Sequence, residues 1–89
     1  MSGNAPDIQL PQLPHARVAI ISSSWHLDIC NDLIAGAQRA LKAASISDVE
    51  VIHVPGSFEI PLAAQLAFEI GFSAVVAVGL VLKGETPHF

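Results

Sequence analysis

The sequence predicts an α/β fold in which a parallel sheet lies between helices, as a three-layer α/β/α sandwich. Three short runs are rich in β-branched residues, and the first and third are apolar almost throughout, which is typical of strands buried in a parallel sheet. The two segments between these runs carry apolar residues at helical spacing. Strands and helices that alternate in this order, β-α-β-α-β, form one sheet with the helices on its faces.

The chain opens with a segment that predicts no regular structure. Residues 1–15 contain one glycine and three prolines with little periodicity, so we expect an extended or disordered arm. Residues 16–89 are then predicted to belong to a single domain. The first strand is predicted over 17–21 (RVAII), and the three serines at 22–24 predict the turn that ends it.

The hydrophobic period changes over residues 28–44, which predict an amphipathic helix. Asp28 suits its start, either as the N-cap or as an acid of the first turn. Polar side chains fill the other faces of this segment. The predicted core face consists of Ile29, Leu33, Ala37, Ala40, Leu41 and Ala44.

The second strand is predicted over 49–54 (VEVIHV) and is closed by a Pro-Gly pair. A second helix is predicted to begin at Ser57 or Glu59, because Pro61 then lies in the first turn, where a missing N–H costs nothing. Gly71 is a natural residue to follow the end of this helix. Its predicted core face consists of Leu62, Leu66 and Ile70.

The third strand is predicted over 73–82 (SAVVAVGLVL), and residues 83–85 follow as a turn. Thr86 and Pro87 then predict the N-cap and first position of a third helix. Only two residues follow before the chain ends at Phe89. We therefore expect this chain to be the N-terminal part of a longer domain, with the C-terminal half absent.

Composition narrows the function classes. Hydrophobic residues make up 52%, charged residues 13%, and the mean hydropathy is +0.55, which favours a chain that buries surface against further chain or neighbouring subunits. A net charge of −4 with four basic residues argues against a nucleic-acid partner. A lone cysteine, Cys30, excludes an internal disulfide and is interpreted as a buried thiol. Neither a secretory signal nor an apolar run of about 20 residues is visible, so we expect a cytoplasmic protein without membrane contact.

Side chains suited to chemistry gather in the loops that follow the strands. Ligands of open α/β sheets bind at the carboxyl ends of the strands. The three predicted loops at that edge are 22–26, 55–59 and 83–89. They would bring together Trp25, Glu59 and His88, a set that suits a planar heterocycle and an anion. No cluster has the spacing of a metal site or of a glycine-rich nucleotide loop.

Each of these residues also has a structural interpretation. Trp25 would be a side chain packed over the end of the sheet, and Glu59 an acid that complements the helix dipole. His88 would be a surface histidine of a first helical turn. Because imidazole titrates near neutral pH, His88 remains the preferred candidate for proton transfer. The other histidines are interpreted as loop, strand and arm residues: His26, His53 and His15.

Three motifs, taken together, resemble the lumazine synthase family. They are SSWH after the first strand, VPGSFEIP after the second and GLVLKGETPHF at the end of the third. They cover about 17–89, and the SSWHxxIC wording resembles bacterial members of the mycobacterial type. The resemblance implies a flavodoxin-like fold and a transferase of riboflavin biosynthesis. This enzyme condenses 5-amino-6-(D-ribitylamino)uracil with 3,4-dihydroxy-2-butanone 4-phosphate to 6,7-dimethyl-8-ribityllumazine, phosphate and water, without metal or organic cofactor.

The resemblance also implies a role for individual residues. Trp25 would stack on the pyrimidine ring, and His88 would transfer protons. Glu85 and Thr86 would hold the phosphate of the butanone. The residues that would bind the ribitylamino-uracil are Ser57, Phe58, Glu59, Leu80, Val81 and Leu82.

The chain departs from the family pattern in two respects. Lys83 stands where many bacterial members have arginine, which keeps the charge but loses the planar fork. The family's C-terminal half, with the last strand, two long helices and an Arg and a Lys at the phosphate end, lies beyond this chain. Since the resemblance also implies a site between subunits of a homopentamer, or of decamers or icosahedral shells built from it, we expect the 89-residue polypeptide alone to be inactive and aggregation-prone. The alternatives are a non-catalytic flavin-binding or shell-forming relative, and an unrelated flavodoxin-like binding module.

Overall fold

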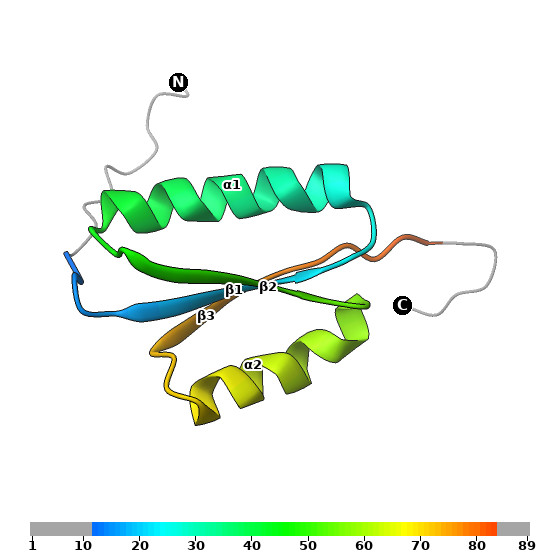
Figure 1. The fold of residues 1–89 in the computed structure, drawn as a ribbon. Helices are drawn as coiled ribbons and strands as arrows, with labels where there is room; N and C mark the ends of the chain where they lie inside the picture. Colours follow the sequence, from blue (N-terminus) through cyan, green and yellow to red (C-terminus); the bar gives the residue numbers. More distant parts are fainter. Residues whose placement is uncertain (1–11, 84–89) are drawn as a thin grey trace, which may run out of the picture.

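A computed structural model describes residues 12–83, which form a three-layer α/β/α sandwich (Figure 1). The elements follow one another in the order β1 (Arg17–Ser23), α1 (Leu27–Ala43), β2 (Asp48–Val54), the 3-10 helix η2 (Ser57–Glu59), α2 (Ile60–Glu69) and β3 (Ala74–Val78). The strands form a parallel sheet in the order β2-β1-β3. Helix α1 covers one face of this sheet and α2 covers the other. The predicted fold class is confirmed.

β1 is the centre of the sheet. It pairs with β2 from Arg17↔Asp48 to Ser23↔Val54 and with β3 from Val18↔Ala74 to Ser22↔Val78. Every residue of β1 except Arg17 is buried. A strand with neighbours on both edges and helices on both faces has no solvent side, which explains why its sequence does not alternate.

The predicted turn at the end of the first strand is wrong for Ser22 and Ser23. Both belong to β1 and are 0% exposed. Their hydroxyl groups are satisfied inside the protein, because Ser22 Oγ donates to Ser23 O at 2.9 Å and Ser23 Oγ lies 3.6 Å from Cys30 Sγ. Small polar side chains that are paired in this way can continue a buried strand. The turn lies two residues later than predicted, at residues 24–26.

Two hydrophobic clusters lie on the two faces of β1, as the alternation of side chains along a strand requires. Ala19 and Ile21 belong to the cluster beside α2, together with Val54, Ala67 and Phe72. Val18 belongs to the other cluster, with Ala44 and Ile46 at the end of α1. The core therefore consists of two thin layers, one on each face of β1.

The predicted core face of α1 is only partly right. Leu41 and Ala44 do pack in the cluster with Val18. Ile29 and Leu33, however, are 44% and 45% exposed, Ala40 is also exposed, and the buried residues of the helix are Cys30 and Ile34. The helix carries more apolar residues than one face against the sheet can hold, so the sequence did not define which of two neighbouring stripes lies inside. Asp28 lies in the first turn as predicted but is not the N-cap.

The predicted core face of α2 is wrong. Its three residues, Leu62, Leu66 and Ile70, are 60%, 50% and 66% exposed. The helix instead packs on the sheet through smaller residues, which are Ile60, Ala63, Ala64 and Ala67. Alanines let the helix approach the sheet closely, and the large side chains then point away from it. The α-helix begins at Ile60, after η2, rather than at Ser57, and Pro61 lies in its first turn as predicted.

The third strand is shorter than the predicted range of 73–82. β3 ends at Val78, which is paired with Ser22, one residue before β1 ends at Ser23. Residues 79–83 therefore run beyond the sheet, where the described structure offers them no partner strand. The apolar residues of the sequence continue past Val78, and nothing in that pattern indicates where the pairing with the neighbouring strand ends.

Only 12–15 of the predicted arm are described, and they contain neither helix nor strand. They are tied to the end of α1, because Leu13 N donates to Ala44 O at 3.0 Å and Gln12 Nε2 to Ala43 O at 3.2 Å. The part of the arm that is described thus follows the surface beside this helix end.

α2 ends in a Schellman motif at Gly71, the residue predicted for this position. Phe72 N donates to Ala67 O at 3.0 Å and Gly71 N to Phe68 O at 3.2 Å, while Gly71 has φ 105°. Ala67 and Phe72 then meet in the core. α1 ends with the same backbone geometry at Ser45, which has φ 62° although it carries a side chain.

Gly71→Ala is expected to lower the free energy of unfolding by about 1–2 kcal/mol, because a side chain at positive φ strains the backbone. An added methyl group would also lie 3.4 Å from Arg17 Nη1. Gly36→Ala is the matched control within α1, where a methyl group would meet only Arg39 Nη2 at 3.5 Å. Removing a helical glycine should raise stability by about 0.5–1 kcal/mol. Urea unfolding measures both variants, and equal effects would contradict the prediction.

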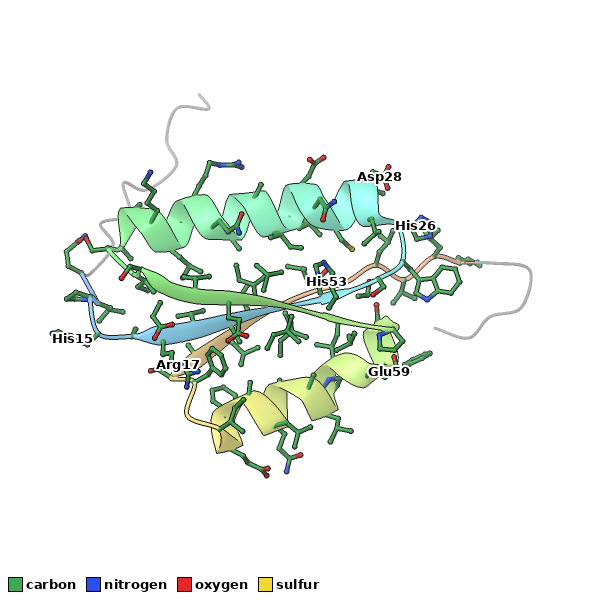
Figure 2. The ribbon with its side chains drawn as sticks, in the orientation of Figure 1. His15, Arg17, His26, Asp28, His53 and Glu59 are labelled. Atoms are coloured by element: carbon green, nitrogen blue, oxygen red, sulfur yellow. The ribbon has the colours of Figure 1, made fainter. Side chains whose placement is uncertain are left out.

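The side chain of Arg17 contacts three other residues at the amino-terminal edge of the sheet. Its Nη1 donates to Ile70 O at 3.2 Å, its Cζ lies 4.2 Å from the centroid of the Phe72 ring, and its Nε lies 3.7 Å from Asp48 Oδ2. Figure 2 shows Arg17 at the opposite end of the sandwich from His26 and Glu59. This cationic side chain therefore stabilises the edge away from the predicted site.

Candidate functional site at the carboxyl edge of the sheet

The loops that follow the three strands are bonded to one another at the carboxyl edge of the sheet. Ser24 Oγ donates to Val54 O at 2.8 Å, which joins the loop after β1 to the end of β2. Ser57 Oγ donates to Leu80 O at 3.3 Å, which joins the loop after β2 to the segment after β3. Three segments far apart in the sequence thus form one continuous surface.

Trp25 and Glu59 border the same residue, Gly56. A methyl group placed on Gly56 would lie 3.1 Å from Glu59 Oε2 and 3.8 Å from both Cδ1 and Nε1 of Trp25. The structure therefore brings together the predicted indole and carboxylate, although they come from loops after different strands. Trp25 is 67% exposed, so most of its indole remains accessible at the end of the sheet. One face of an exposed indole beside a carboxylate is a surface on which a polar ring can stack.

The turn that carries Trp25 is fixed by its backbone and by a buried thiol. His26 precedes α1 in a left-handed conformation, with φ 51° and ψ 56°. Cys30, which is 0% exposed, donates from Sγ to Trp25 O at 3.4 Å. The predicted buried thiol is confirmed, and it holds the turn from the first turn of α1. These two features restrain the backbone at Trp25 and so set the direction in which its side chain leaves the turn.

η2 consists of three of the predicted binding residues, Ser57, Phe58 and Glu59. Phe58 is 80% exposed and belongs to neither hydrophobic cluster. Glu59 is the last residue of η2, its side chain caps no helix, and it forms no salt bridge within residues 12–83. Its place before α2 suits the helix dipole as well, so the structural interpretation also fits its position. Figure 2 shows Glu59 and His26 at the same end of the molecule.

The segment after β3 supplies backbone groups to this edge. Leu80 is partly buried, whereas Val81 and Leu82 are 55% and 60% exposed. Because the ladder with β1 ends at Val78, the amides and carbonyls of the following residues are not used in a strand pair there. Backbone groups that remain outside a ladder are strong donors and acceptors for the edge of a heterocycle.

The phosphate-binding and proton-transfer candidates lie outside the described residues. These are Glu85, Thr86 and His88. Lys83, the last described residue, is exposed. The remaining histidines do not gather at this edge as a group: His53 is exposed within β2, and His15 lies at the opposite end of the molecule in Figure 2.

Three residues of this surface were not predicted as site residues from the sequence: Ser24, Gly56 and Gly79. Gly56 follows Pro55, which marks a turn but does not show which side chains approach it. Gly79 interrupts an apolar run in which the other residues all carry side chains, and that interruption was the available signal. Within residues 12–83, no three His, Cys, Asp or Glu side chains are placed to hold a metal ion. None of the helices in that range has the length and apolar character to cross a membrane.

The comparisons with known proteins concern nearly the whole chain. Residues 15–89 match a family model described as 6,7-dimethyl-8-ribityllumazine synthase. A relative of that name from Leifsonia xyli subsp. xyli is 52% identical over 82% of this chain and 46% of its own length. Relatives of the same name from Pseudarthrobacter chlorophenolicus and Kineococcus radiotolerans are 52% and 43% identical over the whole chain, and 58% and 55% of their own lengths are covered. The chain thus spans about half the length of the curated relatives it matches.

Proposed function

Since the chain belongs to the 6,7-dimethyl-8-ribityllumazine synthase family, we propose that its protein catalyses the lumazine synthase reaction of riboflavin biosynthesis. In this reaction 5-amino-6-(D-ribitylamino)uracil condenses with 3,4-dihydroxy-2-butanone 4-phosphate, and 6,7-dimethyl-8-ribityllumazine, phosphate and water are formed. The observation that carries the proposal is the shared border of Trp25 and Glu59 at Gly56, at the edge where the backbone after β3 runs beyond the ladder with β1.

The ribitylamino-uracil binds at the described part of this edge. Trp25 stacks on the pyrimidine, an interaction worth about 0.5–1.5 kcal/mol beyond the buried area. Glu59 accepts hydrogen bonds from ribityl hydroxyls, and a bond to a charged group contributes about 1.5–3 kcal/mol. Phe58 adds apolar contact from the same 3-10 helix, η2. The ring edge meets backbone groups of residues 80–82.

The butanone phosphate binds at the start of the predicted third helix. Thr86 and Pro87 suit the N-terminus of a helix, whose free N–H groups bind phosphate. Glu85 and Thr86 hold this substrate, and Lys83 adds a positive charge from the preceding turn. These groups would then place the carbonyl of the butanone beside the amine of the ribitylamino-uracil.

His88 moves the protons of the reaction. Formation of the Schiff base, elimination of phosphate and closure of the ring each need a proton to be taken or given. One imidazole can serve several of these steps, because it titrates near neutral pH. The proposal involves no metal or organic cofactor, since condensation and elimination require neither electron transfer nor a Lewis acid.

The protein is proposed to act as a homopentamer, or a multiple of it, in the cytoplasm. The exposed stripe of Leu62, Leu66 and Ile70 on α2 supports self-association, because apolar patches of this kind mark protein interfaces. The high apolar content of the chain agrees with buried subunit contacts.

The function is tested by mixing the full-length gene product with both substrates and following the fluorescence of the lumazine. Glu59→Gln keeps the size of the side chain and removes its charge, so binding of the ribitylamino-uracil should weaken about 10- to 100-fold. Glu69→Gln, at the far end of α2, is the matched control and should bind as the parent does.

Two results would contradict the proposal in different ways. Binding of a flavin without any formation of lumazine would favour the non-catalytic flavin-binding relative. No affinity for a ribityl-pyrimidine in the parent protein would favour the unrelated binding module.

A further inference from the structure

The loop after β2 and the segment after β3 meet in one tight junction, formed by Ser57, Gly79 and Leu80. The hydroxyl of Ser57 donates to the carbonyl oxygen of Leu80 at 3.3 Å, in a partly buried position. A methyl group placed on Gly79 would lie 2.7 Å from Ser57 Oγ and 3.2 Å from the terminal methyl of Ile60. Within residues 12–83, this is the one side-chain hydrogen bond received by the segment 79–83.

Gly79 is needed at this junction for space rather than for backbone conformation. Among the described glycines, only Gly71 has a positive φ. A carbon atom 2.7 Å from an oxygen is far inside the usual contact distance, so any side chain at position 79 would push the hydroxyl away. Because the same hydroxyl bonds the next residue, Leu80, losing the space at Gly79 would also break that bond.

We propose that Ser57 is a positioning residue, whose hydroxyl holds Leu80 and thereby fixes the segment 79–82 against η2. Gly79 provides the space in which that hydroxyl lies. This inference rests on the proposed function, in which the ring edge meets backbone groups of 80–82. The Ser57 hydroxyl then serves the protein rather than the substrate, and the Leu80 carbonyl already has one partner before the substrate arrives.

The consequence for binding follows from the end of the sheet ladder at Val78. Within residues 12–83 the segment has no strand partner beyond that residue, and the hydroxyl of Ser57 is the side chain that bonds it. A backbone that is already held loses less conformational freedom when the ring binds. Loss of the tether should therefore raise KM for the ribitylamino-uracil, while the chemical step changes little.

The test is a double-mutant cycle in the full-length gene product. Ser57→Ala is expected to raise KM for the ribitylamino-uracil by about three- to tenfold, the equivalent of one hydrogen bond, with kcat within about twofold. Gly79→Ala should raise KM at least as much. In the Ser57→Ala background the Gly79→Ala change should add less than it does alone, because the oxygen at 2.7 Å is gone and the closest remaining contact is the Ile60 methyl at 3.2 Å. Ser57→Thr keeps a hydroxyl and should restore KM to within about threefold.

Two matched controls lie away from the junction. Ser47→Ala removes an exposed serine just before β2, and Gly36→Ala adds a methyl group within α1. Both should leave KM unchanged. A rise in KM with either control as large as that of the junction variants would overturn the assignment.

The same cycle measured on unfolding by urea needs no ligand. The two substitutions should be non-additive by a factor of about three or more in the unfolding equilibrium constant. If the parent binds no ribityl-pyrimidine, the proposed function fails, but this unfolding cycle still tests the junction. Independent effects of the two substitutions on unfolding, or an unchanged KM in Ser57→Ala, would overturn the positioning role.

Discussion

His88→Ala is expected to slow turnover by about 10²- to 10⁴-fold without abolishing it, the usual contribution of a general acid–base residue. The residual rate comes from holding two substrates in line, which contributes up to about 7–11 kcal/mol and does not require the imidazole. His88 lies outside the described residues, so the prediction depends on the sequence motif and on family membership. The measurement is kcat from lumazine fluorescence, with substrate affinity determined separately.

The control for this variant is His15→Ala. His15 is exposed and lies at the end of the molecule opposite Glu59 (Figure 2). It should turn over at the parent rate. Complete loss of activity in His88→Ala with substrate binding intact would contradict the prediction, and so would a rate equal to that of the parent.

Ile21→Ala is expected to lower the free energy of unfolding by about 2–5 kcal/mol, because it leaves a cavity in the core. Ile21 is 0% exposed in the centre of β1 and packs in the cluster with Ala67 and Phe72. A loss of this size is a large fraction of the stability of a typical domain. Urea unfolding followed by circular dichroism measures it.

Leu62→Ala is the matched control, because the same chemical deletion is made at a side chain that is 60% exposed. In dilute chain shown to be monomeric by gel filtration, it should change stability by about 0.5 kcal/mol or less. If Leu62→Ala cost as much as Ile21→Ala, the face of α2 that packs on the sheet would be the one first predicted from the sequence.

The order of the elements along the chain could be predicted, because runs rich in β-branched residues alternate with segments of helical spacing. β1, for example, is apolar from Val18 to Ile21, where both of its faces are covered. The faces of the helices could not be predicted as well. In α2 the rule that large apolar side chains face the core gives Leu62 and Leu66, whereas close packing selects Ala63 and Ala67.

The edge at which the candidate site lies could be predicted from topology, since the carboxyl ends of parallel strands meet there. The contacts that shape this edge could not. The bond from Ser57 to Leu80 joins residues that are 23 apart in sequence, and the role of Gly79 depends on where that hydroxyl lies in space. The buried Ser22 and Ser23 misled the prediction for the same reason, because the groups that satisfy them are visible only in the folded chain.

The exposure of Trp25 has a practical result. The chain contains one tryptophan and no tyrosine, so its near-ultraviolet emission originates almost wholly from a single indole beside Gly56. Quenching or a spectral shift of this emission on addition of a compound would therefore show directly that the compound binds at the carboxyl edge of the sheet, without a label and without turnover. The same emission distinguishes compounds that bind at this edge from those that bind elsewhere on the apolar surface.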